Sequence, residues 1–431
     1  MADIKPFRGM LYNTEAVGDL SAVLAPPYDV ISSEMRENLY LRSEFNSVRL
    51  ILGKDFPGDD EHDNKYVRAR RSMDEWISRG ILFTDPEDCF YVYRQEYEVY
   101  GEPRSRTGFL GLMKVEGPDV VLPHEHTLSK PKEDRMNLIR QVESNLSPIF
   151  GLYSGDDKVI TNILNGIVTD GEPVFDTSVD GVRNVLWRVS GNEEISRIRQ
   201  SMQEKKIFIA DGHHRYAVAR AYRDLCRQEE GYDGRADHVM TYLADISSPE
   251  NLTVLGTHRV LKDIPGLERQ NVSERLGEYF TVTRMGGLDE LVKEMRCREQ
   301  KSCIYGLYNG KEFLLLEPAH EGVLKNLIQD KPLCWKDLDV SVLHSAVFEK
   351  VLSLEPKEGD IVYVKAPEDA RRLVAEGKAK LAFLLNPTKI GQLRDVAESG
   401  EMMPQKSTYF YPKLLTGIVM NRFGDQKHKV G

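Results

Sequence analysis

The sequence predicts an α+β protein built from two units, and three observations support this class. Short apolar runs alternate with amphipathic, helix-like stretches over the first 264 residues. Strand-like segments joined by turn residues predict β-hairpins at 89–100 with 107–116 and at 303–308 with 313–317. A new pattern of helices and strands then begins near residue 265. Hairpins mixed with strand–helix alternation are typical of the α+β class.

The length of 431 residues indicates two or three domains. We expect a large first unit with an inserted hairpin at 1–264, a second α+β unit at 265–424, and a flexible tail at 425–431. Hydrophobic residues make up 41% of the chain and charged residues 29%, so both a sizeable core and a well-solvated surface are expected.

The charge and the cysteines restrict the partners and the compartment. The formal net charge is -10, and an acidic surface repels nucleic-acid phosphates and anionic lipid, so we expect neither nucleic acid nor membrane as a partner. Five cysteines without a C-x-x-C pair fit a reduced, cytoplasmic setting. The first residues lack the apolar segment of an export signal, and no run of about 18 apolar residues occurs. We therefore expect a soluble protein that captures any anionic substrate in a local basic pocket.

The elements of the first unit are predicted from apolar periodicity and capping residues. Ser32 and Ser33 are good helix caps, whereas Met73 and Trp76 belong to an apolar helical stripe that we assign to the core. In chain order we expect a strand at 4–13, a helix from 32–33 to 41, a strand at 47–52, a solvated run at 59–63, a helix ending at 80, the hairpin 89–100/107–116, a helix at 136–143, a strand at 148–153, a strand and helix within 206–230, and a hairpin of 239–246 with 252–261.

In the second unit the strongest local signal is the dipeptide Asn309-Gly310, which favours the tight turn of a hairpin. In chain order we expect helices near 267–278 and 287–297, the hairpin 303–308/313–317, a helix near 340–353, strands at 361–365 and 381–385, a helix near 387–398, and a proline-bracketed polar and aromatic loop at 403–413.

The candidate site is organised around a strand, the stretch Asp-Gly-His-His-Arg, and a helix. Asp211 is a good N-cap residue and Gly212 permits a sharp turn, so His213, His214 and Arg215 enter the first helical turn. The unpaired N–H groups and the positive dipole end of a helix favour an anion there, and the arginine adds a fork suited to phosphate. The alternative is an ordinary capped turn whose histidines are exposed.

A second polar concentration runs over 124–135. His124 and His126 lie on one face of an extended segment and Glu125 on the other. Three interpretations stay open. The histidines could bind zinc with a third ligand from the Asp-Gly-His-His-Arg stretch, or Glu125 could be a general base beside them. The segment could also be a solvated loop in which Asp134 begins a helix.

Other candidates are single residues. Asp29 follows Pro-Pro-Tyr and is either functional or the cap of the next helix. Lys406, Ser407 and Lys413 could bind phosphate in a loop, and Arg49 within an apolar run needs a partner if it is buried. Walker-type, dinucleotide-binding and nucleophile-elbow motifs do not occur in the sequence.

Six motifs stand out along the chain: Pro26-Pro-Tyr-Asp-Val-Ile31, Pro123-His-Glu-His-Thr127, Asp134-Arg135, Asp211-Gly-His-His-Arg215, Thr257-His-Arg259 and Lys406-Ser-Thr-Tyr-Phe-Tyr-Pro412. With these motifs the chain resembles the bacterial and archaeal family called domain of unknown function 1015, whose name carries no activity. More distantly, the strand, Asp-Gly-His-His-Arg and helix resemble the signature loop of the ParB/sulfiredoxin superfamily, which includes free L-serine kinases.

The superfamily resemblance implies a ParB/sulfiredoxin-like mixed α/β core with insertions in residues 1–264, acting as the phosphate-binding catalytic unit, followed by the second α+β unit. Asp211 would be a cap or a magnesium-side carboxylate, and the acidic base would be Glu125 or, second, Asp29. The remaining candidates are His124 and Asp134 for catalysis, and Gly212, His213, His214, Arg215, Arg135, Lys406 and Ser407 for binding phosphate or nucleotide.

The function implied is phosphoryl transfer to or from a small hydroxylated metabolite such as L-serine, with Mg²⁺ and a nucleotide such as ATP or ADP, or pyrophosphate. We expect a small-molecule substrate and allow a homodimer. Two alternatives stay open: a nucleotide-binding regulatory module without turnover, and a metal-dependent hydrolase using His124, His126 and His213. The phosphoryl-transfer hypothesis expects Arg215 to be available to a ligand rather than engaged within the protein.

Overall fold

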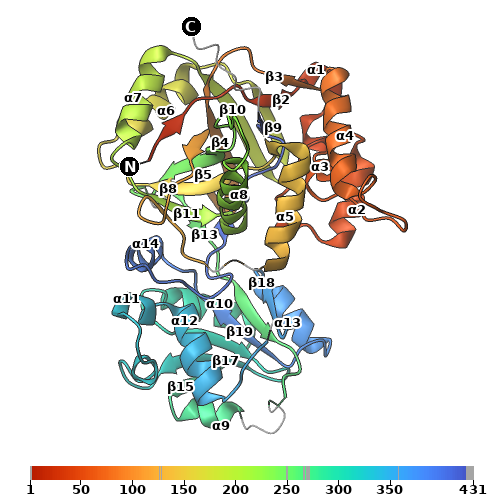
Figure 1. Ribbon diagram of the computed structural model, residues 1–431. Helices are drawn as coiled ribbons and strands as arrows, with labels where there is room; N and C mark the ends of the chain where they lie inside the picture. Colours follow the sequence, from red (N-terminus) through yellow and green to blue (C-terminus); the bar gives the residue numbers. More distant parts are fainter. Residues whose placement is uncertain are drawn as a thin grey trace. The chain divides into compact units, whose positions relative to one another are not determined.

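The computed structural model describes residues 2–125, 127, 129–248, 251–265, 267, 272–357 and 359–423. The chain forms two compact units (Figure 1). Among described residues, unit 1 comprises 2–123, 127–253 and 412–423, and unit 2 comprises 124–125 and 254–411. The sequence analysis divided the chain at 264/265, whereas this grouping places 254–264 with unit 2 and returns 412–423 to unit 1. The predicted tail at 425–431 lies outside the described residues.

Unit 1 is built on a mixed β-sheet. Among its described residues, nine strands form the sheet in the order β6-β11-β8-β12-β5-β4-β10-β9, with β1 beside β5. The pairs β6/β11 and β8/β12 are parallel and the other pairs are antiparallel. The strands are β1 (Ile4–Lys5), β4 (Phe90–Val99), β5 (Glu102–Lys114), β6 (Val121–Leu122), β8 (Ile149–Tyr153), β9 (Phe175–Val179), β10 (Val182–Val189), β11 (Ile207–Asp211) and β12 (His238–Asp245).

The helices of unit 1 bury apolar side chains against this sheet. One core cluster joins Ile160 of α6, Ile198 of α7 and Tyr216 of α8 to strand residues such as Phe109. The helices are α1 (Thr14–Val17), α2 (Ser33–Arg42), α3 (Val48–Ile51), α4 (Lys65–Ser78), α5 (Ser129–Val142), α6 (Val159–Asp170), α7 (Asn192–Met202) and α8 (His213–Cys226), with 3₁₀ turns η1 (Leu20–Ala22) and η2 (Tyr28–Val30). Short strands pair as β2 (Met10–Tyr12) with β3 (Leu82–Thr84), and β7 (Ser144–Asn145) with β21 (Asn421–Arg422).

Unit 2 contains an antiparallel sheet in the order β15-β17-β16-β19-β14-β18. Leu291 of α10 and Val374 of α13 pack in one cluster with Ala382, whereas the neighbouring Phe383 contacts Phe348 of a π-helix. The elements are β14 (His258–Leu261), α9 (Val272–Gly277), β15 (Phe280–Met285), α10 (Leu288–Cys297), β16 (Tyr305–Tyr308), β17 (Phe313–Pro318), η4 (Lys325–Leu327), α11 (Leu333–Lys336), α12 (Asp339–Val342), the π-helix Leu343–Val351, β18 (Ile361–Val364), α13 (Pro367–Ala375), β19 (Leu381–Leu385), α14 (Ile390–Glu398) and β20 (Phe410–Tyr411), with β13 (Thr253–Val254) at the unit boundary.

The predicted α+β class is confirmed, and so are the hairpins β4/β5 and β16/β17. The Ser32 side chain caps α2 as expected. The predicted strand at 47–52 is wrong, because residues 48–51 form α3. Its Arg49 finds partners in Tyr40, donating to the carbonyl oxygen at 3.0 Å and lying 4.3 Å from the ring centroid. A run of four to six apolar residues does not distinguish a buried strand from a buried helical turn.

The predicted hairpin of 239–246 with 252–261 is also wrong. Strand β12 instead lies between β5 and β8 in unit 1, and β14 lies between β18 and β19 in unit 2. Helix α5 begins at Ser129, seven residues before the predicted start at Met136. Within the described part of the chain, no helix is both long and apolar enough to span a bilayer.

Candidate functional site

The turn between β11 and α8 differs in detail from the predicted cap. The register of β11 shifts between Ile209 and Asp211, which places Asp211 opposite Phe150 of β8. Such a bulge re-aims the side chain that follows it. Gly212 is the N-cap of α8, with φ +94° in the left-handed region and no side-chain cap. The expectation that Asp211 caps the helix is therefore wrong, and its carboxylate is used elsewhere.

The Asp211 carboxylate joins two cations. Its Oδ2 accepts a hydrogen bond from Arg215 Nη2 at 2.7 Å, and its Oδ1 pairs with the Lys413 ammonium. Arg215 Nη1 also donates to the carbonyl oxygen of Pro148. The exposed fractions are 20% for Asp211, 15% for Arg215 and 11% for Lys413, so the group is shielded from water. The structure thus engages Arg215 within the protein, where the sequence analysis expected it to be available.

The amino end of α8 lies beside this group. The first i→i−4 bond of the helix runs from Tyr216 N to Gly212 O at 2.9 Å. The main-chain N–H groups of His213, His214 and Arg215 therefore precede the helical ladder. His213 is buried and His214 is half-buried, so neither is an exposed surface histidine, as the alternative of an ordinary capped turn requires.

Tyr28 connects the Pro-Pro-Tyr-Asp motif to this site. Its ring lies 4.1 Å from the Arg135 guanidinium carbon. Burial raises the pKa of the Tyr28 hydroxyl, and the charges of Arg135, Asp29, Arg215 and Asp211 also act on that pKa. The Pro-Pro-Tyr-Asp motif thus contacts the Asp134-Arg135 motif through this ring, and it lies within electrostatic range of Asp211 and Arg215. Asp29 itself is exposed in the 3₁₀ turn η2.

Asp134 and Arg135 form a mainly structural cluster. Arg135 donates to the carbonyl oxygen of Ile51 at 2.7 Å and from Nε to Asp134 at 2.9 Å. Asp134 also accepts from the Tyr66 hydroxyl at 2.8 Å and lies 3.3 Å from Lys65 Nζ. Burial acts to raise the pKa of Asp134, yet Arg135, Tyr66 and Lys65 together hold that pKa below its usual value. The cavity at this cluster is about 10 Å³, room for one water and too small for a phosphate.

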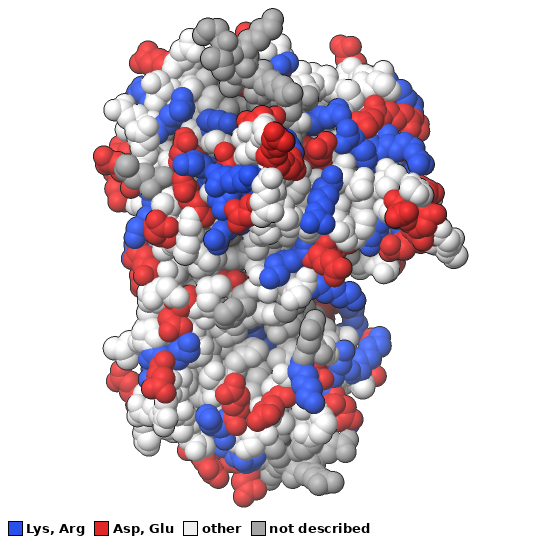
Figure 2. All heavy atoms as spheres, in the orientation of Figure 1, with Lys and Arg blue, Asp and Glu red and all other residues white. Residues whose placement is uncertain are grey.

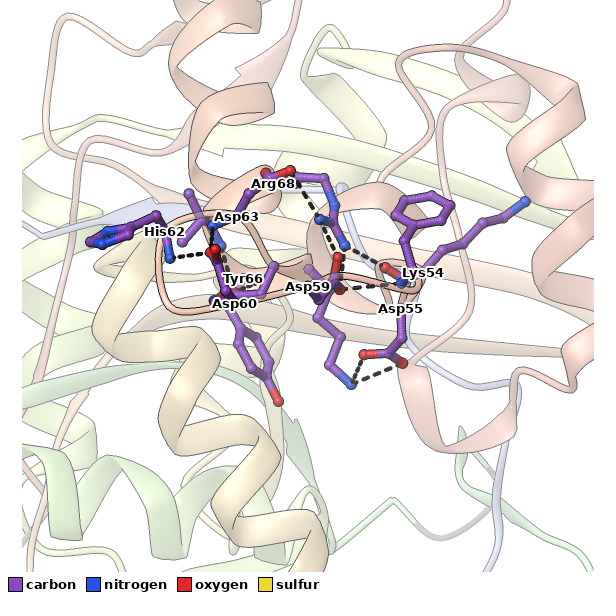
Figure 3. Close-up of polar contacts among 12 residues, drawn as sticks. Lys54, Asp55, Asp59, Asp60, His62, Asp63, Tyr66 and Arg68 are labelled. Carbon is purple, nitrogen blue, oxygen red and sulfur yellow. Dashed lines mark hydrogen bonds and ion pairs between the residues drawn. The ribbon is translucent and has the colours of Figure 1, made fainter.

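The acidic run before α4 is held by its own charges and main-chain N–H groups (Figure 3). Arg68 donates to both Asp59 oxygens at 2.8 Å, and Asp60 accepts from the main-chain N–H groups of His62 and Asp63. These contacts fix the start of α4, where Lys65 and Tyr66 reach Asp134. On the face shown in Figure 2, acidic and basic side chains are interspersed in both units.

The other predicted residues lie in unit 2. Glu125 accepts a hydrogen bond from Ser407 N at 3.1 Å, and His124 Nε2 lies 3.1 Å from Thr408 Oγ1. Arg259, buried in β14, donates to the carbonyl oxygen of Lys406 at 3.0 Å. Burial lowers the pKa of Arg259 to about 10. The motifs at 124–125, 257–259 and 404–408 thus assemble within unit 2.

A metal site is not preformed in the described residues, where no group of three or more His, Cys, Asp or Glu is placed to hold an ion. His213 belongs to unit 1 and His124 to unit 2, and His126 lies outside the described residues. A magnesium ion that arrives with nucleotide phosphates requires only one or two protein carboxylates. In the structure, both oxygens of the Asp211 carboxylate at the start of α8 are engaged, one by Arg215 and the other by Lys413.

Sequence reasoning missed part of the site. Lys413 was predicted, with Lys406 and Ser407, as a phosphate-binding candidate, but its pairing with Asp211 was not, and the buried Arg106 of β5 was not among the predicted residues. A signal for Arg106 was present, because an arginine at a core-facing position of an alternating strand requires a specific partner. The contact between Lys413 and Asp211 joins residues 202 positions apart and has no local signal.

The sequence model of the family described as "Protein of unknown function (DUF1015)" matches residues 4–341. The chain belongs to this family. No curated protein matches it. Among solved structures, it is similar to a free serine kinase in complex with AMP, at 15% identity and a TM-score of 0.35, covering 70% of this chain and 86% of that one.

Two further solved structures are similar at the same level. One is a conserved hypothetical protein from Pyrococcus furiosus, with 14% identity, a TM-score of 0.34, and coverage of 71% of this chain and 92% of that one. The other is SbnI with a C-terminal truncation from Staphylococcus aureus, with 13% identity, a TM-score of 0.36, and coverage of 71% and 85%. Because these identities and TM-scores are low, the function of this chain is inferred from its own residues.

Proposed function

We propose that the protein transfers a phosphoryl group to or from a small hydroxylated metabolite, such as L-serine or its phosphoester, and binds the phosphate at the start of α8. The observation that supports this most is the convergence of three positive elements on Asp211: the amino end of α8, the Arg215 guanidinium and the Lys413 ammonium. Phosphoryl transfer asks the protein mainly for alignment and charge compensation. A carboxylate with two cations leaves one net positive charge, which favours an incoming anion.

Asp211 acts as an internal stand-in for the ligand. Arg215 and Lys413 donate to its oxygens as they would to phosphate oxygens, so a phosphate binds by exchange with the carboxylate. The main-chain N–H groups at the start of α8 supply further donors to the bound phosphate. Asp211 would then be the carboxylate that holds a magnesium ion bound with a nucleotide such as ATP or ADP, and the ion would supply charge compensation. This exchange reconciles the engaged Arg215 with an anion site.

Asp29 is the better candidate for the proton acceptor. It is exposed and adjacent to Tyr28, whose hydroxyl responds to the charges of Asp211 and Arg215. A carboxylate there could accept the proton of an attacking hydroxyl. Glu125, by contrast, uses its carboxylate to hold the Ser407 N–H in unit 2. That contact favours a role for Glu125 in fixing the loop at 404–408.

The internal pairing of Arg215 also favours a second candidate, a nucleotide-binding module without turnover. Anion binding by exchange needs no base, so the same geometry could serve regulation alone. Turnover separates the two functions. With ATP or ADP, Mg²⁺ and L-serine, ³¹P NMR should show a new phosphoester for an enzyme and unchanged nucleotide for a binding module.

Binding is tested by thermal stability with ADP, ATP, pyrophosphate and O-phosphoserine, each with and without Mg²⁺. A ligand at 100 times its dissociation constant should add about 2.7 kcal/mol of stability. Arg215→Ala should weaken the effective ligand by ~10- to 160-fold, because a hydrogen bond between charged groups contributes about 1.5–3 kcal/mol. Arg220→Ala, at an exposed arginine of the same helix, is the matched control.

Two outcomes would contradict the proposal. If Arg215→Ala and Arg220→Ala bind every effective ligand equally well, the anion site is elsewhere. If Asp29→Asn lowers affinity and turnover by equal factors, Asp29 contributes to binding rather than to proton transfer.

A further inference from the structure

A row of polar and aromatic side chains crosses one face of the sheet of unit 1. In register across neighbouring strands, Asn184 pairs with Gln95, Gln95 with Arg106, Tyr242 with Phe150, and Phe150 with Asp211. Side chains directly opposite one another in paired strands share a face. The Arg106 guanidinium carbon lies 4.7 Å from the Phe150 ring centroid and 5.8 Å from that of Tyr242, which joins the two halves of the row.

Arg106 is an unusual member of this row, because it is fully buried and is described with no carboxylate partner. Its Nη2 donates to Gln95 Oε1 and, at 2.6 Å, to the carbonyl oxygen of Pro412. Within the part of the chain that the structure describes, its Nε and Nη1 are buried without a hydrogen-bond partner. Moving a cation from water into the protein interior carries a large desolvation penalty, so a buried arginine indicates a specific structural role. The aromatic faces beside it recover only part of this penalty.

The contacts of Arg106 and Gln95 converge on the chain segment that carries Lys413. Arg106 holds the Pro412 carbonyl, and Gln95 Nε2 donates to the Lys413 carbonyl at 3.2 Å. Gln95 Nε2 is also 3.2 Å from Asn184 Oδ1, which accepts from the Tyr93 hydroxyl at 2.5 Å. The carbonyl groups of Pro412 and Lys413 are therefore both fixed to the sheet. The side chain of Lys413, which leaves the main chain between these two carbonyls, pairs with Asp211.

We infer that Arg106 and Gln95 are positioning residues that hold the Pro412–Lys413 main chain against the sheet, so that the Lys413 ammonium meets Asp211 at the start of α8. Pairing a flexible lysine with a carboxylate at a shielded site costs side-chain entropy. Anchoring the carbonyl groups before and after the Lys413 Cα fixes its main chain beforehand, so that only the side chain has to be ordered when the ion pair forms. A proline at 412 limits the backbone further, because its ring fixes φ. The consequence for ligand binding rests on the proposed function, but the placement of Lys413 does not.

Lysine labelling tests the placement without any ligand. In the folded protein Lys413 should react slowly with acetic anhydride, because its ammonium is paired and 11% exposed. Lys205 is the matched control, since it is 12% exposed and paired with Asp157 at 3.2 Å on another part of unit 1. Arg106→Gln should raise the labelling rate of Lys413 at least several-fold and leave that of Lys205 unchanged. Gln95→Met removes the contacts of Gln95 to the Lys413 carbonyl, to Arg106 and to Asn184, and it keeps the hydrogen bond from Arg106 to the Pro412 carbonyl. It should therefore act in the same direction and more weakly.

The two readouts separate the possible failures. If Arg106→Gln raises the labelling rates of Lys413 and Lys205 equally, it loosens the whole unit, and the Gln95→Met variant then decides between the explanations. If the labelling rate of Lys413 in Gln95→Met equals that of the wild type, the inference is overturned. Binding of ADP gives the second test: Lys413→Ala and Arg106→Gln should each weaken it, and the double variant should bind like Lys413→Ala alone. Multiplying losses would show that Arg106 acts on the ligand independently of Lys413. If no nucleotide or pyrophosphate binds the wild type, the proposed function fails while the labelling result stands.

Discussion

Replacing Gly212 by alanine tests the geometry on which the candidate site depends. Gly212 has φ +94°, and an ideal Cβ there would lie 3.1 Å from Arg215 Nε and Nη2 and 3.2 Å from Cζ. An L-residue in the left-handed region costs roughly 1–2 kcal/mol. The neighbouring guanidinium cannot easily move away, because it is tied to Asp211 and to the Pro148 carbonyl. We therefore expect Gly212→Ala to lower the free energy of unfolding of unit 1 by about 1–3 kcal/mol.

A second glycine supplies a control with the opposite sign. Gly166 is exposed and lies in the middle turns of α6, away from both helix ends, and a Cβ there would meet nothing within 4 Å. Gly166→Ala should raise the free energy of unfolding by roughly 0.5–1 kcal/mol, because alanine loses less backbone entropy in a helix. Urea unfolding followed by circular dichroism measures both variants under identical conditions. Gly212→Ala should also weaken phosphate-ligand binding, since Arg215 must shift.

The reasoning would be refuted if Gly212→Ala were as stable as the wild type, or shifted in the same direction as Gly166→Ala. Either result would mean that residue 212 does not adopt the left-handed conformation or that Arg215 does not lie over it. A variant that unfolds earlier but binds ligand like the wild type would keep the backbone conclusion and remove Arg215 from the anion site.

Other predictions concern two histidines of unit 2 and the ion pair of Asp134 and Arg135 in unit 1. Burial lowers the pKa of His258 to about 4 and that of His344 to about 3, against about 6.5 in an unfolded chain. Both side chains stay neutral in the folded protein. Their contribution to the free energy of unfolding is therefore complete above about pH 6.5 and is lost as the pH falls toward 4, because the unfolded chain binds protons at a higher pH than the folded one. Urea midpoints between pH 4 and 7 measure this loss of stability with falling pH. The control His62→Gln, at a side chain 85% exposed, should leave the pH dependence unchanged. A wild-type midpoint that does not vary with pH would contradict the prediction. Arg135→Ala should cost about 1–3 kcal/mol, because the half-buried Asp134 loses its closest cation and keeps Lys65. Arg135→Met with Asp134→Asn should recover most of that loss, and equal stabilities for the two variants would contradict the ion-pair interpretation.

Local chemistry explains the predictions that were confirmed. Ser32 caps α2 by accepting a hydrogen bond from an N–H three residues away. Asn309-Gly310 lies in the four-residue loop 309–312 between β16 and β17, where the Asn309 side chain accepts from the N–H groups of Lys311 and Glu312. The turn after β11 belongs to the same class, since Gly212 supplies the left-handed residue that begins α8. Where the signal was only an apolar run, as at 47–52, the outcome depended on distant packing and the prediction was wrong.

The sequence by itself determined the α+β class, the family motifs and the existence of a helix that begins with Gly-His-His-Arg. Only the tertiary structure decided which of those motifs meet: Tyr28 with Arg135 and Asp211 with Lys413 in unit 1, and Glu125 with the loop at 404–408 in unit 2. The physical reason is distance along the chain. A cap or a tight turn forms between residues within about four positions of each other, whereas the ion pair of Asp211 and Lys413 spans 202 positions and exists only because the sheet and its C-terminal segment bring the two side chains together.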